Sequence, residues 1–204
     1  MTDFKSRAVN SSGKLSSAKT SRGEQSRLRI IKSTRLILAN TDLSSLKLDL
    51  VADKSGVAKS SILWHFGSKN GLLLAVVEDI FDGMQQLIAK VSFAAPDKKE
   101  RLKSAMMLVA EEMQKTPEAN TLLISFIVNQ TIDTTINKHI KEMYDSYRLF
   151  IKSVLTSAGV EVSDLYPSVI LAFIDGAFMQ WYLQPDKIEL KELFVQFLDI
   201  IILE

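Results

Sequence analysis

The side chains with the most evident chemistry lie in the segment 51–74, VADKSGVAKSSILWHFGSKNGLLL. Lysine ammonium groups donate to guanine O6 and N7, serine hydroxyls bond to several bases, and cations bind phosphates. Lys59 is therefore the candidate for direct base readout. The side chains expected to contact DNA, either at base edges or at phosphates, are Arg27, Lys47, Lys59, Ser60, Ser61, Trp64, His65 and Lys69.

The spacing of small and apolar residues in this segment predicts the helix pair that would position these groups. Ala52 lets two crossing helices approach closely, and Gly56, four residues later, can adopt the positive φ of a tight turn. Val51, Val57 and Ile62 supply apolar contacts that would hold the second helix across the first. This is a helix-turn-helix pattern, although the same spacing also occurs in ordinary helical hairpins.

The residues after the helix pair separate these two interpretations. Trp64-His65-Phe66 is followed by Gly67-Ser68-Lys69 and an apolar run, with Ser68 placed to cap a long helix. This segment resembles the TetR family of bacterial transcriptional regulators. The matching positions are Val51, Ala52, Gly56, Val57, Ile62, His65, Phe66, Lys69, Leu72 and Leu73. The resemblance covers residues 27–77 specifically, and the rest of the chain only in helical pattern and length.

Three positions depart from the family pattern. Leu63 replaces a tyrosine whose hydroxyl donates to a DNA phosphate in the family, and leucine cannot donate. Asp49 lies where basic residues are frequent, and its carboxylate would repel phosphate. A common threonine cap is missing before the first helix of the pair, so Ser44 or Ser45 is expected to cap it.

Composition bounds the class of protein. The chain has 204 residues, 47% of them hydrophobic, which is enough for one or two well-packed domains. It has no cysteine, which excludes disulfides and thiolate metal sites, and no secretory signal at its start; both fit a reducing bacterial cytoplasm. The most apolar stretch, 169–183, is short for a membrane span and contains Asp175, so no membrane association is expected.

Charge is divided unevenly along the chain. Residues 1–73 hold 13 Lys and Arg against 5 Asp and Glu, whereas the remainder holds 12 against 19. A basic N-terminal third is typical of a segment that contacts a polyanion. The alternative is that these charges are exposed to solvent and have no binding role. Residues 1–24 are rich in Ser, Lys and Arg and are predicted to be disordered, either as a basic arm that reaches DNA or as an inert tail.

The apolar periodicity predicts an all-α fold of about nine helices. An amphipathic helix over 25–40, with one basic face, precedes the helix pair over 46–55 and 58–66 and completes a three-helix DNA-binding domain, residues 25–70. Residues 71–204 form a C-terminal helical bundle for effector binding and dimerisation. Its helices are predicted over 69–93, 97–115, 118–130, 134–158, 164–184 and 187–203.

The last two predicted helices are apolar over more of their circumference than one small core requires. Pairing them with a second copy would cover the excess, and the family resemblance implies the same homodimer; the alternative is that they form the centre of the bundle. The expected dimerisation residues are Phe173, Ala177, Trp181, Phe194, Phe197 and Ile201. A two-fold dimer would present two recognition helices to a palindromic operator, about 34 Å apart.

The resemblance further implies a small-molecule pocket inside the bundle. An apolar wall with a few polar anchors such as Asn129, Gln130 or Tyr147 would favour a lipophilic or aromatic effector. Methionine and aromatic residues at helical spacing are also ordinary core residues. The candidate lining residues are Phe81, Met84, Met107, Met113, Phe126, Met143, Tyr144, Tyr147, Phe150 and Phe178.

Catalytic chemistry lacks its usual parts in this sequence. There are two histidines, His65 and His139, no cysteine and no glycine-rich phosphate loop, so we expect neither an enzyme nor a cofactor or metal. The predicted function is a DNA-binding transcriptional regulator, a ligand-responsive repressor in the family's commonest behaviour. The alternative, based on Asp49 and Leu63, is a related ligand- or protein-binding module that has lost specific DNA recognition.

Overall fold

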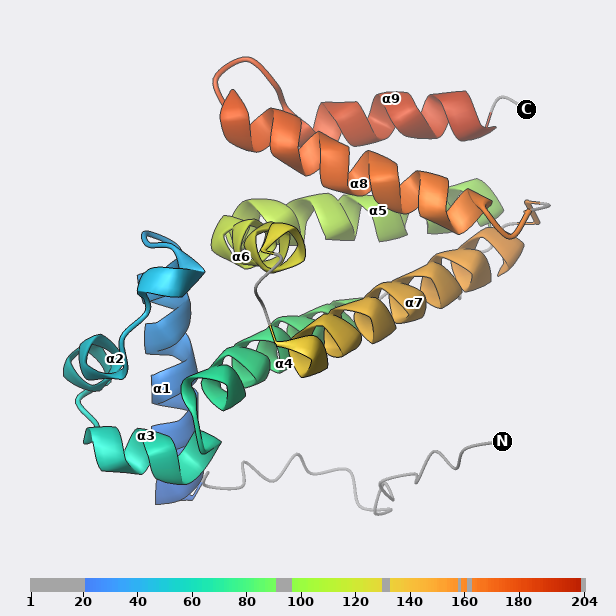
Figure 1. Ribbon diagram of the computed structural model, residues 1–204. Helices are drawn as coiled ribbons and strands as arrows, with labels where there is room; N and C mark the ends of the chain where they lie inside the picture. Colours follow the sequence, from blue (N-terminus) through green and yellow to red (C-terminus); the bar gives the residue numbers. More distant parts are fainter. Residues whose placement is uncertain (1–20, 91–96, 130–132, 158, 161–162, 203–204) are drawn as a thin grey trace, which may run out of the picture.

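A computed structural model describes residues 21–90, 97–129, 133–157, 159–160 and 163–202 of the chain. In these residues all regular structure is helical, which confirms the predicted all-α fold (Figure 1). The elements are α1 (Arg22–Leu38), a 3-10 turn η1 (Leu43–Ser45), α2 (Leu48–Ser55), α3 (Lys59–Phe66), α4 (Lys69–Ile88), α5 (Lys98–Lys115), α6 (Pro117–Val128), α7 (Thr134–Ser157), α8 (Tyr166–Leu183) and α9 (Leu190–Ile202).

The helices α1, α2 and α3 form a three-helix unit at one end of the molecule (Figure 1). Gly56 ends α2 with φ 64°, in the left-handed region that glycine adopts without steric cost. The turn places α3 across α2, and Val51 and Ile62 become fully buried between them and α1. The predicted helix-turn-helix geometry is therefore confirmed.

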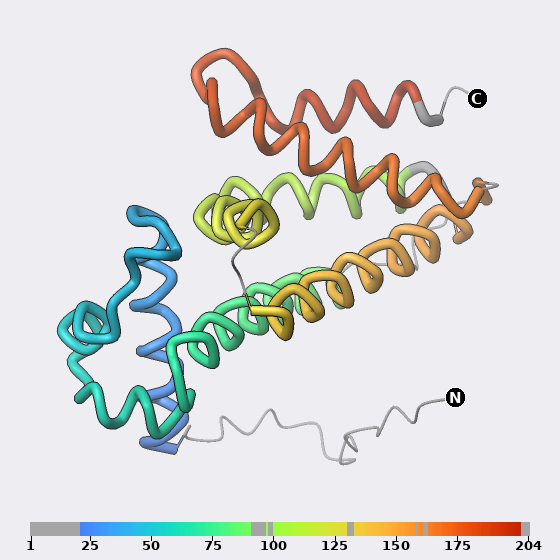
Figure 2. Tube along the Cα trace, viewed as in Figure 1, coloured from blue at the N-terminus to red at the C-terminus, as the bar shows by residue number. Residues whose placement is uncertain are grey.

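Helix α4 leaves this unit and runs alongside α7 into the rest of the molecule (Figures 1 and 2). It begins where the sequence indicates, because the Ser68 hydroxyl accepts a hydrogen bond from the Gly71 amide at 3.0 Å. Its buried face, which includes Leu72 and Val76, packs on α1 and α3. One long helix thus connects the three-helix unit to the bundle.

The remaining helices form the bundle, in which α8 packs against α7 and α9, and α5 lies against α9. Two apolar clusters fill the molecule. One is built from α1 to α4, α6, the first part of α7 and Leu171, and the other from α5, the end of α7, α8 and α9. The first cluster runs across residues 70 and 71, so the predicted domain boundary there stays a prediction.

Several predicted helix ends were wrong. Helix α1 begins at Arg22, three residues earlier than predicted, because Ser21 and Glu24 form a reciprocal capping box. The disorder expected for residues 22–24 is therefore incorrect. The rest of the predicted arm, residues 1–20, lies outside the described residues. Helix α4 ends at Ile88, not at residue 93, which lies outside the description. Gln130 also lies outside it.

The expected caps of α2 were also wrong. Lys47 is the N-cap and makes no side-chain capping bond. Burial of Leu43 and Leu46 holds residues 43–45 in the 3-10 turn η1, where the Ser45 hydroxyl donates to the Asp42 carbonyl instead. Among the described residues, no helix is long and apolar enough to cross a membrane.

Candidate nucleic-acid interface and cavity

Helix α3 presents its polar positions on one exposed face. Lys59 and Ser60 are exposed, Ser61 is partly exposed at the same end, and the Trp64 side chain is 80% exposed one turn later. His65 is half-buried, and its ring lies edge-on to that of Trp64 with the ring centres 4.7 Å apart. The structure therefore brings the predicted α3 residues together on the surface opposite buried Ile62.

Lys59 has an intramolecular partner that the sequence did not indicate. Its Nζ lies 2.9 Å from the Asp49 carboxylate of α2, across the Gly56 turn. Both side chains are largely exposed, at 49% and 70%, so the pair is screened by solvent and readily broken. The candidate base-reading cation is held by the same acidic residue that departs from the family pattern.

The other predicted cations are placed differently from one another. Lys69 Nζ donates to the Ser44 carbonyl at 3.1 Å, which ties the start of α4 to η1. The guanidinium of Arg27 lies 5.5 Å from the centre of the Phe66 ring and 3.8 Å from Glu78. Lys47 is exposed at the start of α2. Lys69 and Arg27 thus brace the unit in the free protein, whereas Lys47 is exposed to solvent.

Two helix N-termini are uncapped by side chains on this unit. Neither Lys47, the N-cap of α2, nor Ala58, the N-cap of α3, accepts a hydrogen bond from the first turn with its side chain. The first amides of a helix have no partner within it, and the helix dipole adds partial positive charge there. Phosphate oxygens are suitable acceptors for such amides.

A cavity of about 170 Å³, partly open to solvent, lies among the helices of the bundle beyond this unit. Helices α4 to α8 supply most of its wall, and α1 contributes Arg35. Of the sequence candidates, Met84, Met113, Tyr144, Tyr147 and Phe150 line it. Phe126, Met143 and Phe178 are buried in the two apolar clusters, and Phe81 and Met107 pack against these clusters, so these five candidates contribute to packing. Asn129 is not in the cavity wall.

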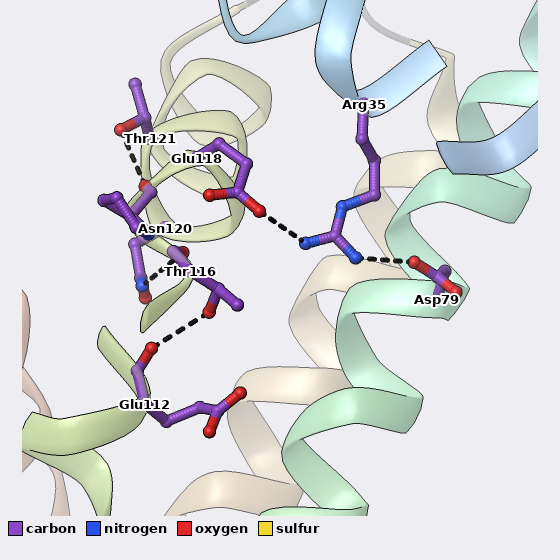
Figure 3. Close-up of polar contacts among 8 residues, drawn as sticks. Arg35, Asp79, Glu112, Thr116, Glu118, Asn120 and Thr121 are labelled. Carbon is purple, nitrogen blue, oxygen red and sulfur yellow. Dashed lines mark hydrogen bonds and ion pairs between the residues drawn. The ribbon is translucent and has the colours of Figure 1, made fainter. Parts of the chain in front are cut away.

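Arg35 connects the three-helix unit to the cavity. Its guanidinium donates to the Asp79 carboxylate of α4 at 2.8 Å and to the Glu118 carboxylate of α6 at 3.3 Å (Figure 3). The three side chains are only 21% to 32% exposed, which strengthens the contacts relative to a surface pair. Arg35 and Asp79 both line the cavity, so its occupation can act on this link.

A second polar group faces the cavity from α7 and α8. The Tyr144 hydroxyl donates to the Asp175 carboxylate at 3.1 Å. Burial raises the pKa of Asp175, although the Tyr144 hydrogen bond opposes the shift. Burial also raises the pKa of Tyr144 and of its neighbour Tyr147 well above their ordinary range. The sequence carried one signal for this group, because Asp175 interrupts an apolar run.

The family model described as "Bacterial regulatory proteins, tetR family" matches residues 30–76. These residues cover the second half of α1 together with α2, α3 and the first part of α4, which is the unit carrying the exposed face of α3. Residues 30–76 are therefore a DNA-binding domain of the TetR-family type. The coarse function is accordingly that of a DNA-binding transcriptional regulator.

Solved structures share the TetR-family fold over most of the chain. A TetR-family regulator from Agrobacterium tumefaciens matches with a TM-score of 0.72 at 16% identity, over 88% of this chain and 98% of that one. FadR from Bacillus subtilis, solved with stearoyl-CoA, gives a TM-score of 0.72 at 16% identity, covering 85% and 96%. A TetR regulator from Haloarcula marismortui gives 0.72 at 19%, covering 86% and 95%. No curated protein matches in sequence.

The predicted dimerisation residues are not all on the surface of the single chain. Ala177 and Phe194 are buried within the single chain, in the cluster of α5, the end of α7, α8 and α9. Their contact with a partner stays a prediction. Phe173, Trp181 and Phe197 are half-buried, and the ring of Phe173 stacks on that of Phe197 with the ring centres 3.7 Å apart. The side chain of Ile201 lies outside the described part. The large hydrophobic side chains exposed on α8 and its N-cap are Leu165, Val169, Met179, Tyr182 and Leu183.

Proposed function

We propose that this chain is a ligand-responsive repressor that binds a palindromic operator as a homodimer. One observation carries the proposal: the Gly56 turn holds α3 across α2 so that Lys59, Ser60 and Trp64 share one exposed face. A face of this kind is what a recognition helix places in the major groove.

In this proposal each half-site is bound in two ways. The uncapped amide ends of α2 and α3 and the cations Lys47 and Lys69 contact phosphates and fix the register. Lys59 leaves Asp49 and donates to guanine O6 and N7, while Ser60 and Ser61 bond to neighbouring base edges. Direct readout by Lys59 therefore requires that its ion pair with Asp49, at 2.9 Å, be broken.

The homodimer is supported by the surface of α8 and α9. Leu165, Val169 and Leu183 are each more than half exposed, and Val169 and Leu183 are two members of one helical stripe along α8. Ile200 of α9 is also exposed, at 70%. A monomer would leave this apolar surface in water, whereas a two-fold contact through α8 and α9 removes it.

Ligand response is supported by the Arg35 link. Any ligand that separates α4 from α6 must stretch the contacts of Arg35 with Asp79 and Glu118, and Arg35 belongs to α1 of the DNA-binding unit. The two recognition helices of a dimer must keep their separation to fit one operator. A shift transmitted through Arg35 would therefore lower operator affinity.

A mobility-shift assay tests this function. Duplexes tiled across the DNA upstream of the chain's own gene should include one that is retarded in the presence of excess competitor DNA. Lys59→Ala should weaken binding to that duplex by about 1–3 kcal/mol per half-site and relax its sequence preference. Equal retardation of every duplex by the wild-type chain would contradict the proposal.

The second candidate function is a ligand- or protein-binding module without specific DNA recognition. The Asp49–Lys59 pair favours it, because the paired lysine is withheld from bases, and Leu63 offers no hydroxyl to phosphate. The same assay separates the candidates. A chain that binds all duplexes weakly, with Lys59→Ala changing nothing, belongs to this second class.

A further inference from the structure

The wall of the cavity is mostly apolar, and most of its charged groups are acidic. Asp79, Glu112 and Asp175 line it, against one cation, Arg35. Arg35 already contacts two carboxylates, Asp79 and Glu118. Figure 3 draws no contact at the carboxylate of Glu112, which has no ion pair within the described residues. The cavity therefore has an excess of negative charge.

A hydroxyl on the same wall has no hydrogen-bond partner. The side chain of Tyr147 is 8% exposed, and its Oη has no partner in the part of the chain that the structure describes. Buried polar atoms nearly always have a partner, and one without it at a cavity wall indicates a polar group of a ligand. Tyr147 lies beside Tyr144, with ring centres 5.9 Å apart.

The carboxylate next to these tyrosines is itself only partly satisfied. Asp175 accepts one hydrogen bond, from Tyr144, and has no cationic partner among the described residues. A carboxylate offers about four acceptor positions, and a buried one without a cation is costly. An ammonium group bound here would supply both the missing charge and further donors, and Tyr147 Oη would accept one of them.

The size of the cavity limits the ligand. An apolar cavity of about 150 Å³ in another protein holds benzene. The present cavity, at about 170 Å³, therefore has room for one aromatic ring with a short polar arm. Its apolar wall, which includes Met84, Phe150 and Ile174, suits the ring.

We infer that the cavity binds a small lipophilic cation of the arylalkylammonium class. Its ammonium donates to the Asp175 carboxylate and the Tyr147 hydroxyl, and its ring packs among the apolar side chains. Glu112 adds negative potential that excludes carboxylates of the same size. The inference rests on the proposed ligand response, for which it names the class of effector.

The test compares three probes that share one ring and differ in charge: 2-phenylethylamine, 2-phenylethanol and phenylacetate. Calorimetric titration of the full chain at pH 7 should give the amine a Kd at least about tenfold below those of the other two. Asp175→Asn and Tyr147→Phe should each weaken amine binding by about tenfold and leave the alcohol within about twofold. Asp82→Asn, an exposed carboxylate on α4 outside the cavity wall, is the matched control and should change neither.

Several results would overturn the inference. Phenylacetate binding as tightly as the amine would show that the charge argument is wrong. An equal loss of amine affinity in Asp82→Asn would show a general charge effect. If Asp175→Asn does not fold, Tyr147→Phe alone tests the site. Failure of all three probes to bind, in a preparation that still retards its operator, would refute this site and leave the regulator intact. Amine binding that does not change operator affinity would support the site and refute ligand response.

Discussion

Replacing Asp49 by Asn should tighten binding to the operator. The substitution preserves the shape of the side chain and removes the charge that holds Lys59 at 2.9 Å. The lysine no longer has to leave an ion pair before it reaches guanine. The same change removes a carboxylate from a surface that faces phosphates.

The size of the effect follows from the exposure of the pair. With side chains 49% and 70% exposed, the pair contributes about 0.2–1 kcal/mol, the range for exposed ion pairs. A dimer opens two pairs per operator, so the gain is about 0.4–2 kcal/mol. This corresponds to a Kd about 2- to 30-fold lower.

Fluorescence anisotropy with labelled operator at fixed salt measures this change. Asp53→Asn is the matched control, since Asp53 lies one turn further along α2, is exposed and carries no ion pair in the described structure. The gain for Asp49→Asn should exceed that of the control and should be smaller on unrelated duplex DNA. Equal gains in both variants, or weaker binding by Asp49→Asn, would refute the reasoning that the pair restrains Lys59.

Three further predictions concern residues that the structure places in defined contacts. Lys69→Ala should weaken binding to all duplexes alike and reduce the slope of log Kd against log salt by about 2 per dimer, whereas unchanged binding would leave Lys69 with only its contact to Ser44. Arg35→Met should lower the free energy of unfolding in urea by about 1–3 kcal/mol, because two half-buried carboxylates lose their cation. The control Lys32→Met, at an exposed site on the same helix, should have little effect. Equal losses in the two variants would count against a stabilising contact of Arg35 with Asp79 and Glu118. Asp175→Asn should be more stable than the wild type at pH 7, because the raised pKa of Asp175 means that burial disfavours its charged form. The stability advantage of the variant should shrink as the pH falls from the pKa of Asp175 in the folded chain towards its ordinary value near 4. A wild type more stable than Asp175→Asn at pH 7 would contradict this prediction.

Local signals in the sequence predicted the features that depend on neighbouring residues. Gly56 indicated the turn, Ser68 indicated the start of α4, and the periodicity of apolar residues indicated the helices. Each of these depends on backbone conformation or on contacts within a few residues. The failed cap at Ser44 or Ser45 was local too, but there the burial of Leu43 and Leu46 outweighed the capping preference.

Contacts between distant segments could not be predicted in this way. Arg35 meets partners 44 and 83 residues away, and Tyr144 meets Asp175 across 31 residues, so no spacing in the sequence indicates them. The same limit applies to the faces of α8 and α9. Composition showed an excess of apolar residues, but only packing against α5 decided that Phe194 is buried while Leu183 remains exposed.

The central claim is that two chains together read one specific duplex. Sedimentation of the complex with the retarded duplex tests it most directly, since each chain adds 22.8 kDa. The account predicts two chains per operator and an affinity well above that for competitor DNA. One chain per duplex, or equal affinity for operator and competitor, would contradict it.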